Sequence, residues 1–199
     1  MGSKLYETRP EIFLPRFERL HHNVDAAASD KNALLRPLCS IAPPPWVPVA
    51  ERGSEAREWT EPGATWNGRC SRCQACVGRY YTEATNGLNP EHYEEGDRVW
   101  CNPPFDYSIY SWLKLASECR RRGILWDCLL PSSTGTRWFQ DFVWDRRFGR
   151  PREGVELDFT PGRITFLLDG KPVLDKNGKE QQARHETIFV TFWPEGMRP

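Results

Sequence analysis

The tetrapeptide NPPF (residues 102–105) ends an apolar run that begins at Val99. Because proline lacks a backbone N–H and cannot donate to a β-ladder, the run predicts a strand that stops at Asn102. The two prolines fix the backbone and leave the side-chain oxygen of Asn102 and the carbonyl of Pro103 as free acceptors. A planar amine can donate one hydrogen to each, while Phe105 stacks on the ring that carries the amine.

Binding of this kind would overcome the low nucleophilicity of the amine. An exocyclic amine on adenine delocalises its lone pair into the ring and is a poor nucleophile. Two acceptors that hold the amine hydrogens favour a pyramidal nitrogen with its lone pair directed outward. A methyl donor held in line can then react through positioning and electrostatics. The alternative for the motif is a rigid turn that only ends a strand.

The elements that must position this motif follow an α/β pattern. Their order predicts a three-layer α/β domain with a mixed sheet and an antiparallel hairpin at one edge. In open α/β sheets ligands bind beyond the carboxyl ends of the strands, which is where the tetrapeptide is expected. The expected elements are a short helix within 5–20 that Pro15 limits, strands at 99–101, 123–131 and 186–193, helices at 108–123 and 136–145, and a hairpin at 155–168 with its turn at Pro161-Gly162.

Length and composition exclude several classes of protein. The 199 residues suffice for one domain with a hydrophobic core. No apolar run approaches a membrane span and no signal peptide is visible, so we expect no membrane association. The formal net charge of zero argues against general coating of nucleic acid but leaves room for a local basic patch. Seven cysteines without a secretory signal indicate thiols or metal ligands and an intracellular, reducing location.

Residues 35–75 form an irregular insertion rich in proline, tryptophan and cysteine. A stretch this long without helical or strand periodicity needs a staple or a function. The spacing C-x2-C-x2-C and one upstream cysteine could close a tetrahedral zinc site with four thiolates. Free thiols and an iron–sulfur cluster are the alternatives, and His92 is the rival fourth ligand. The candidate zinc ligands are Cys39, Cys70, Cys73 and Cys76.

A basic segment interleaved with aromatic residues follows the strand expected at 123–131. It offers positive charge for phosphate groups beside the expected position of Asn102. The alternative is a solvated, partly paired loop, because Asp141, Asp145 and Glu153 lie among the arginines. The candidate nucleic-acid-binding residues here are Arg137, Arg146, Arg147, Arg150 and Arg152.

Six segments follow one another along the chain: ETRPEIF, NVDAAASDKNAL, CVGRYYTEATNGL, VWCNPPF, LLPSSTGTRWFQDFV and ELDFTPGRITF. In these segments, which occur in the same order, the chain resembles the phage-type, Dam-like family of DNA N6-adenine methyltransferases. The resemblance implies a Rossmann-like class I methyltransferase domain over residues 1–199, with 35–75 as an insertion. It also implies a site-specific enzyme that transfers a methyl group from S-adenosylmethionine to the exocyclic N6 of adenine in DNA, in the host cytoplasm if a phage encodes it.

The matched positions imply roles for individual residues. The NPPF residues Asn102, Pro103, Pro104 and Phe105 would form the target-adenine site. Asp25 would accept from the amino or ribose groups of the cofactor, and Thr8 would lie near its methionine carboxylate; a helix cap is the alternative for both. Arg163 would contact DNA or hold the hairpin. The implied cofactor-binding residues are Thr8, Asp25, Ala26 and Ala27.

Other functions share parts of this pattern. A base inside a duplex is out of reach, so the target adenine must be flipped or unpaired. The NPPF motif alone also suits another planar amine, such as cytosine N4, an RNA base or a glutamine amide. A non-catalytic, zinc-stapled nucleic-acid-binding protein is the alternative from a different class. The recognition sequence and the oligomeric state do not follow from the sequence.

Overall fold

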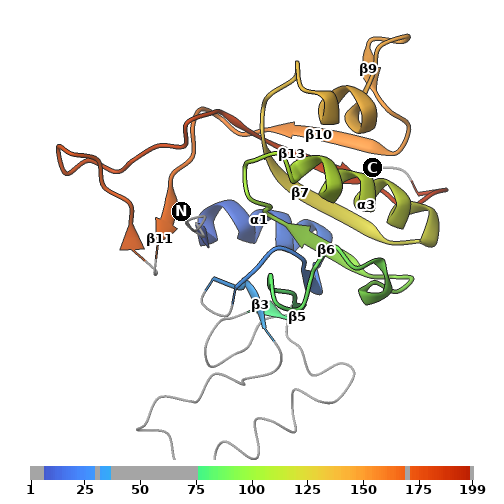
Figure 1. The fold of residues 1–199 in the computed structure, drawn as a ribbon, viewed down its shortest axis with the longest axis horizontal. Helices are drawn as coiled ribbons and strands as arrows, with labels where there is room; N and C mark the ends of the chain where they lie inside the picture. Colours follow the sequence, from blue (N-terminus) through green and yellow to red (C-terminus); the bar gives the residue numbers. More distant parts are fainter. Residues whose placement is uncertain (1–6, 30–31, 37–75, 169–170, 198–199) are drawn as a thin grey trace, which may run out of the picture.

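The computed structural model describes residues 7–29, 32–36, 76–168 and 171–197. These residues form an α/β fold around one main sheet (Figure 1). No helix within these ranges is long and apolar enough to cross a membrane. In order across the main sheet, the strands are β10 (Val155–Phe159), β13 (Thr187–Phe192), β7 (Leu125–Pro131), β6 (Arg98–Cys101), β2 (Val24–Asp25) and β5 (Arg79–Tyr80).

The main sheet is mixed, as expected. Strands β5, β2, β6 and β7 pair in parallel, whereas β13 is antiparallel to both of its neighbours, β7 and β10. The order reverses between β2 and β6. After β2, the next strand of the sheet is β5 on one side, and after β6 it is β7 on the other side. Such a reversal leaves a crevice at the carboxyl ends of the two central strands.

The prediction of a hairpin at 155–168 is wrong. Strand β10 pairs with β13 from Val155↔Phe192 to Phe159↔Ile188, and the chain then leaves the main sheet. The antiparallel strand is therefore β13, which lies inside the sheet and not at its edge. The turn at Gly162 does form, with φ of 71°, but the segment after it pairs elsewhere.

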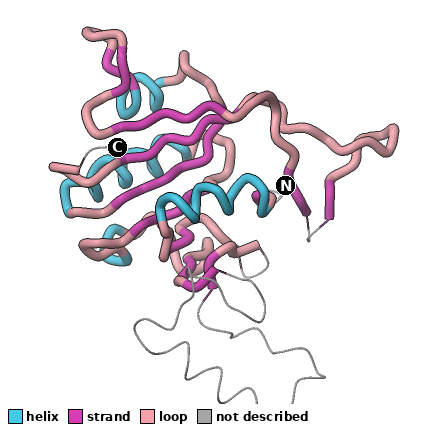
Figure 2. The backbone as a smooth tube through the Cα atoms, turned by 180° about the vertical axis from the view of Figure 1, so that it is seen from behind, coloured by secondary structure: helices cyan, strands magenta, loops and turns pink. Residues whose placement is uncertain are grey.

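Helices cover both faces of the main sheet, which confirms the expected three layers. Helix α3 (Ile109–Cys119) lies on the face seen in Figure 1, and α1 (Pro10–Leu20) lies on the face seen in Figure 2. Side chains alternate along β6, so Val99 and Cys101 join the core under α3 whereas Trp100 joins the core under α1. This alternation fixes the direction in which the residue after Cys101 can point.

The helices differ from expectation in their lengths. Helix α1 runs through Pro15 to Leu20, because its buried face packs on the sheet and outweighs the missing hydrogen bond. Helix α3 continues as the 3₁₀ helix η3 (Arg120–Arg122), and Gly123 ends it with φ of 78°, as predicted. The helix expected at 136–145 is shorter and contains the π-helix η4 (Phe139–Val143). A further 3₁₀ helix, η2, spans Pro90–His92.

Two short ladders lie outside the main sheet. Strands β3 (Leu35–Arg36) and β4 (Cys76–Val77) pair in parallel where the chain enters and leaves the insertion. Residues 37–75 lie outside the described residues. Strands β8 (Trp144–Asp145) and β9 (Arg150–Pro151) form the β8–β9 hairpin after η4.

Residues 160–186 form an arm that extends beyond the main sheet (Figures 1 and 2). Strand β11 (Phe166–Leu168) of the arm pairs with β1 (Glu7–Thr8) on one side and with β12 (Lys171–Pro172) on the other. We call this ladder the arm sheet. Arg9, next to β1, also forms an ion pair with Glu180 of the arm at 2.6 Å. The arm is thus anchored to the start of the described chain.

A buried ion pair joins α1 to the centre of the main sheet. Arg16 donates to both carboxylate oxygens of Asp127 on β7, at 3.0 and 2.6 Å, and Thr191 donates to the same carboxylate at 2.9 Å. Nε2 of His22 lies 3.3 Å from Asp127, and both side chains are fully buried. Burial by itself raises the pKa of Asp127, but the side-chain hydrogen bonds of His22 and Arg16 outweigh it and lower that pKa.

This cluster predicts loss of stability in mild acid. Burial lowers the pKa of His22 below its unfolded value of about 6.5, so lowering the pH protonates the unfolded chain first. The depressed pKa of Asp127 removes further stability at lower pH. We expect the free energy of unfolding, measured with urea, to fall from about pH 7 to about pH 5 by up to about 1.4 kcal/mol per pH unit.

A matched pair of variants tests the source of this pH dependence. His22 packs on the rings of Phe13 and Trp100, each 5.7 Å away between centroids, so His22→Phe keeps the packing. It should flatten the profile above about pH 5, whereas the exposed His185→Gln should leave it unchanged. An unaltered slope in His22→Phe would contradict the assignment.

Candidate active site

The NPPF tetrapeptide occupies the carboxyl end of β6, as predicted. Its residues differ in burial, because the strand ends at Cys101 and the chain then turns toward α3. Asn102 is half-buried and lines a pocket, Pro103 is buried, and Phe105 is 39% exposed. Within the part of the chain that the structure describes, neither Oδ1 of Asn102 nor the Pro103 carbonyl accepts a hydrogen bond. Of these two residues, Asn102 lines the pocket, whereas Pro103 is buried next to it.

The pocket is an open hollow of about 200 Å³, a volume that includes space open to solvent. It lies where β2 and β6 end side by side, with Asp25 in register with Trp100. This is the point of the main sheet at which the strand order reverses, the usual position of a ligand in an open α/β sheet. The lining residues are Glu7, Thr8, Asp25, Ala27, Asn32, Leu34, Trp100 and Asn102.

Asp25 brings a buried carboxylate to this pocket. Its side chain is 3% exposed, and its Oδ2 accepts from the backbone N–H of Leu34 at 3.0 Å. The backbone N–H of Ala26 continues the β2–β6 ladder by donating to Trp100 at 2.9 Å. Asp25 thus ends a strand and does not cap a helix. Ala27 beside it is small enough for a ligand to approach the backbone.

Thr8 meets Asn102 inside the pocket. Nδ2 of Asn102 donates to Oγ1 of Thr8 at 3.0 Å, and Thr8 is 3% exposed. Thr8 lies on β1, opposite Phe166 of the arm sheet, and Arg9 takes the N-cap position of α1. The family resemblance assigns Thr8 to the cofactor and Asn102 to the target adenine. The structure therefore places residues assigned to two different ligands in direct contact.

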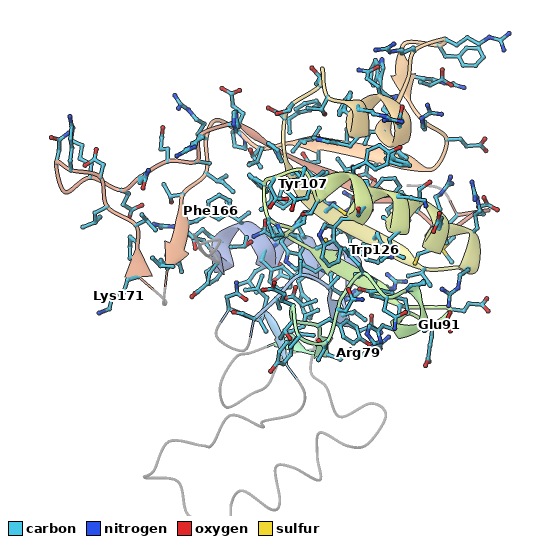
Figure 3. All side chains as sticks on the ribbon, viewed as in Figure 1. Arg79, Glu91, Tyr107, Trp126, Phe166 and Lys171 are labelled. Atoms are coloured by element: carbon cyan, nitrogen blue, oxygen red, sulfur yellow. The ribbon has the colours of Figure 1, made fainter. Side chains whose placement is uncertain are left out.

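Aromatic side chains surround the outer part of this site. The ring of Phe105 meets the ring of Phe166 edge to face, with centroids 6.0 Å apart. Tyr107, two residues further on, is 93% exposed. Figure 3 shows Phe166 on the arm and Tyr107 on the loop that follows β6. Phe105 is accordingly partly exposed and contacts its neighbour in the arm.

Comparison with known families agrees with this arrangement. A model of the family "DNA N-6-adenine-methyltransferase (Dam)" matches residues 69–195. The chain belongs to this family. The match includes β6, the NPPF tetrapeptide and the arm, whereas Thr8 and Asp25 precede it. Neither the curated proteins nor the solved structures gave a significant match.

The structure separates the arginines that the sequence grouped. In this Dam-family chain, Arg163 lies at the turn into the arm. Arg137 lies just before η4, the β8–β9 hairpin carries Arg146, Arg147 and Arg150, and Arg152 follows β9. Figures 1 and 2 place β9 and β11 at opposite ends of the main sheet. On the hairpin, the guanidinium groups of Arg147 and Arg150 lie 5.2 and 5.3 Å from the ring of Phe148, which is 59% exposed.

The remaining arginines of that group have intramolecular partners. Arg137 pairs with Asp141 at 3.2 Å, and its side chain is 82% exposed. Arg146 and Arg152 donate to the side chain and the carbonyl of Gln140, at 2.6 and 3.1 Å. All of these pairs are exposed, so they can exchange for phosphate at low cost.

The cysteines fall into two groups. Cys39, Cys70 and Cys73 lie outside the described residues, and for Cys76 only the backbone in β4 is described. Over the described ranges there is no group of His, Cys, Asp and Glu that could hold a metal ion, so the zinc site stays a prediction. The others are free, buried thiols, as predicted: Cys101, Cys119 and Cys128.

Several residues of the site escaped the sequence analysis. Trp100 and Leu34 read as ordinary apolar residues, yet both line the pocket. The signal for Trp100 was its place two residues before Asn102, on the same side of β6. No sequence pattern pointed to Phe166, because it is distant from Phe105 in the sequence and meets it only in the folded chain.

Proposed function

We propose that this protein transfers a methyl group to the exocyclic N6 of adenine in DNA. The observation that carries the proposal is the position of Asn102. Its amide lines a pocket at the switch point of the main sheet, and its oxygen accepts no hydrogen bond from the described residues, in a chain of the DNA N-6-adenine-methyltransferase family. S-adenosylmethionine, when bound, supplies the methyl group.

In this proposal, the NPPF tetrapeptide binds the target adenine. The adenine amine donates one hydrogen to Oδ1 of Asn102 and the other to the carbonyl of Pro103. Phe105, with its exposed face, stacks on the purine ring. Catalysis then rests on orientation and on electrostatic stabilisation of the charge that develops on the amine. A neutral asparagine does not act as a general base here.

The residues around the pocket suit the cofactor. A nucleoside presents hydroxyl and amino donors, and the buried carboxylate of Asp25 is an acceptor for them. Ala27 leaves room for close approach to the backbone. The strand order, with the pocket at its reversal and the antiparallel β13 next to the edge strand β10, supports a Rossmann-like class I methyltransferase domain.

DNA must present an extrahelical or unpaired adenine to this pocket. Positive charge near the molecule's two ends supports contacts with phosphate groups. Arg163 stands on the arm side, and the β8–β9 hairpin carries the exposed pair Arg147 and Arg150 around Phe148. An aromatic ring flanked by arginines suits a base or a base step at least as well as a phosphate.

The deciding experiment is mass spectrometry of nucleosides after incubation of unmethylated DNA with purified protein and isotopically labelled S-adenosylmethionine. We expect labelled N6-methyl-2′-deoxyadenosine in the DNA digest. Parallel incubations with RNA and with protein serve as comparisons. Label in N4-methylcytosine, in RNA or in a glutamine amide would move the proposal to another planar amine. If no substrate becomes labelled although the cofactor binds, the protein is a binding module.

The cofactor site has its own test. We expect Asp25→Ala to weaken S-adenosylmethionine binding at least about tenfold in isothermal titration, because a charge-assisted hydrogen bond is lost. Asn102→Ala is the comparison, since its amide serves the substrate, and it should change the affinity less than about threefold. Unchanged affinity in Asp25→Ala would remove this residue from the cofactor site.

A further inference from the structure

We propose that the arm sheet positions both halves of the adenine grip, with Thr8 orienting the amide of Asn102 and Phe166 orienting the ring of Phe105. The inference rests on the proposed function and assigns positioning roles to two residues. One of them, Thr8, thereby acts on the substrate side of the pocket and not primarily on the cofactor. The two residues face each other across one ladder, because Thr8 is in register with Phe166.

Thr8 holds the Asn102 amide by its nitrogen end. The hydroxyl accepts from Nδ2 at 3.0 Å, and this bond turns Oδ1 to the other side. An amine substrate needs an acceptor at that position, because Nδ2 would meet it donor to donor. Thr8 is buried, so water does not readily replace its hydroxyl. The side chain of Thr8 thus holds the Asn102 amide in the orientation that an amine substrate needs.

Phe166 holds the aromatic half of the grip. Phe105 is 39% exposed and lies in the loop between β6 and α3. The edge-to-face contact with Phe166, at 6.0 Å between centroids, restricts the ring, and its exposed part serves the purine. Because β11 is anchored to β1, the same ladder sets both contacts.

The first test compares Thr8→Val with Thr8→Ser. Valine has the shape of threonine without the acceptor, so the single-turnover rate of methyl transfer to DNA should fall about tenfold at saturating DNA and cofactor. Serine restores the hydroxyl and should recover most of that loss. The dissociation constant of S-adenosylmethionine, measured by titration, should change less than about twofold in both. A weaker cofactor complex with a normal saturated rate would overturn the assignment and place Thr8 at the cofactor.

The second test is a double-mutant cycle between Phe105 and Phe166. Phe166→Leu should slow single-turnover transfer about threefold, the effect of one aromatic pair, whereas Phe166→Tyr keeps the ring edge and most of the rate. In a Phe105→Leu background, Phe166→Leu should have no further effect. An equal effect in both backgrounds would show that Phe166 acts through folding or another contact.

These outcomes are distinguishable from failure of the proposed function. If wild-type protein transfers no methyl group to DNA, the proposed function fails before any variant is compared. If the wild type is active and Thr8→Val and Phe166→Leu are equally active, only the positioning roles fail. Circular dichroism and urea denaturation of each variant show whether the fold is retained.

Discussion

Asn102→Ala is expected to lower the rate of methyl transfer to DNA by about 10²- to 10³-fold, the effect of removing one preorganised hydrogen-bonding group from a reacting centre. The alanine removes the acceptor for the substrate amine while the pocket wall contributed by Asp25 and Trp100 remains. Single-turnover assays with labelled cofactor measure this loss. Retention of more than about a tenth of the rate would mean that the amide does not bind the reacting amine.

Asn102→Asp is the matched control for this prediction. A carboxylate still offers an oxygen to the amine, and Thr8 can donate its hydroxyl to the second oxygen instead of accepting. We therefore expect Asn102→Asp to keep far more activity than Asn102→Ala. Equal loss in the two variants would indicate that Nδ2 and not Oδ1 is the required atom.

The largest effect on stability is expected from Arg16→Met. The side chains of Arg16 and Asp127 are 5% and 0% exposed, so the substitution leaves a buried carboxylate without its cation. Removing one partner of a buried ion pair typically costs about 3–5 kcal/mol, because the remaining charge is neither solvated nor neutralised. Methionine retains much of the packing of the arginine stem. Urea denaturation at neutral pH measures the change in the free energy of unfolding.

Arg19→Met provides the comparison one turn along the same helix. Arg19 makes two hydrogen bonds to Glu156, at 2.6 and 2.7 Å, but its side chain is 44% exposed. Solvent screens this pair, so the substitution should cost about 1 kcal/mol or less. Similar costs for Arg16→Met and Arg19→Met would contradict the argument that burial decides the effect.

The sequence determined the parts of this protein that depend on local chemistry. Two prolines after an apolar run stop a strand whatever the surroundings, so the end of β6 at Cys101 and the position of Asn102 were predictable. The helical periodicity that begins at Ile109 and the glycine at 123 likewise placed α3 and its end. The order of these elements was sufficient to predict three layers and a mixed sheet.

Tertiary structure decided the pairing of strands and the contacts between distant segments. The segment 155–168 has the composition of a hairpin, but its two strands pair with different partners. Strand β10 pairs with β13, and β11 pairs with β1. Hydrogen bonding in a ladder is the same for any partner, so the sequence of a strand does not name its neighbour. The contact of Thr8 with Asn102 and that of Phe105 with Phe166 depend on these pairings, which is why only the folded chain brought the two halves of the site together.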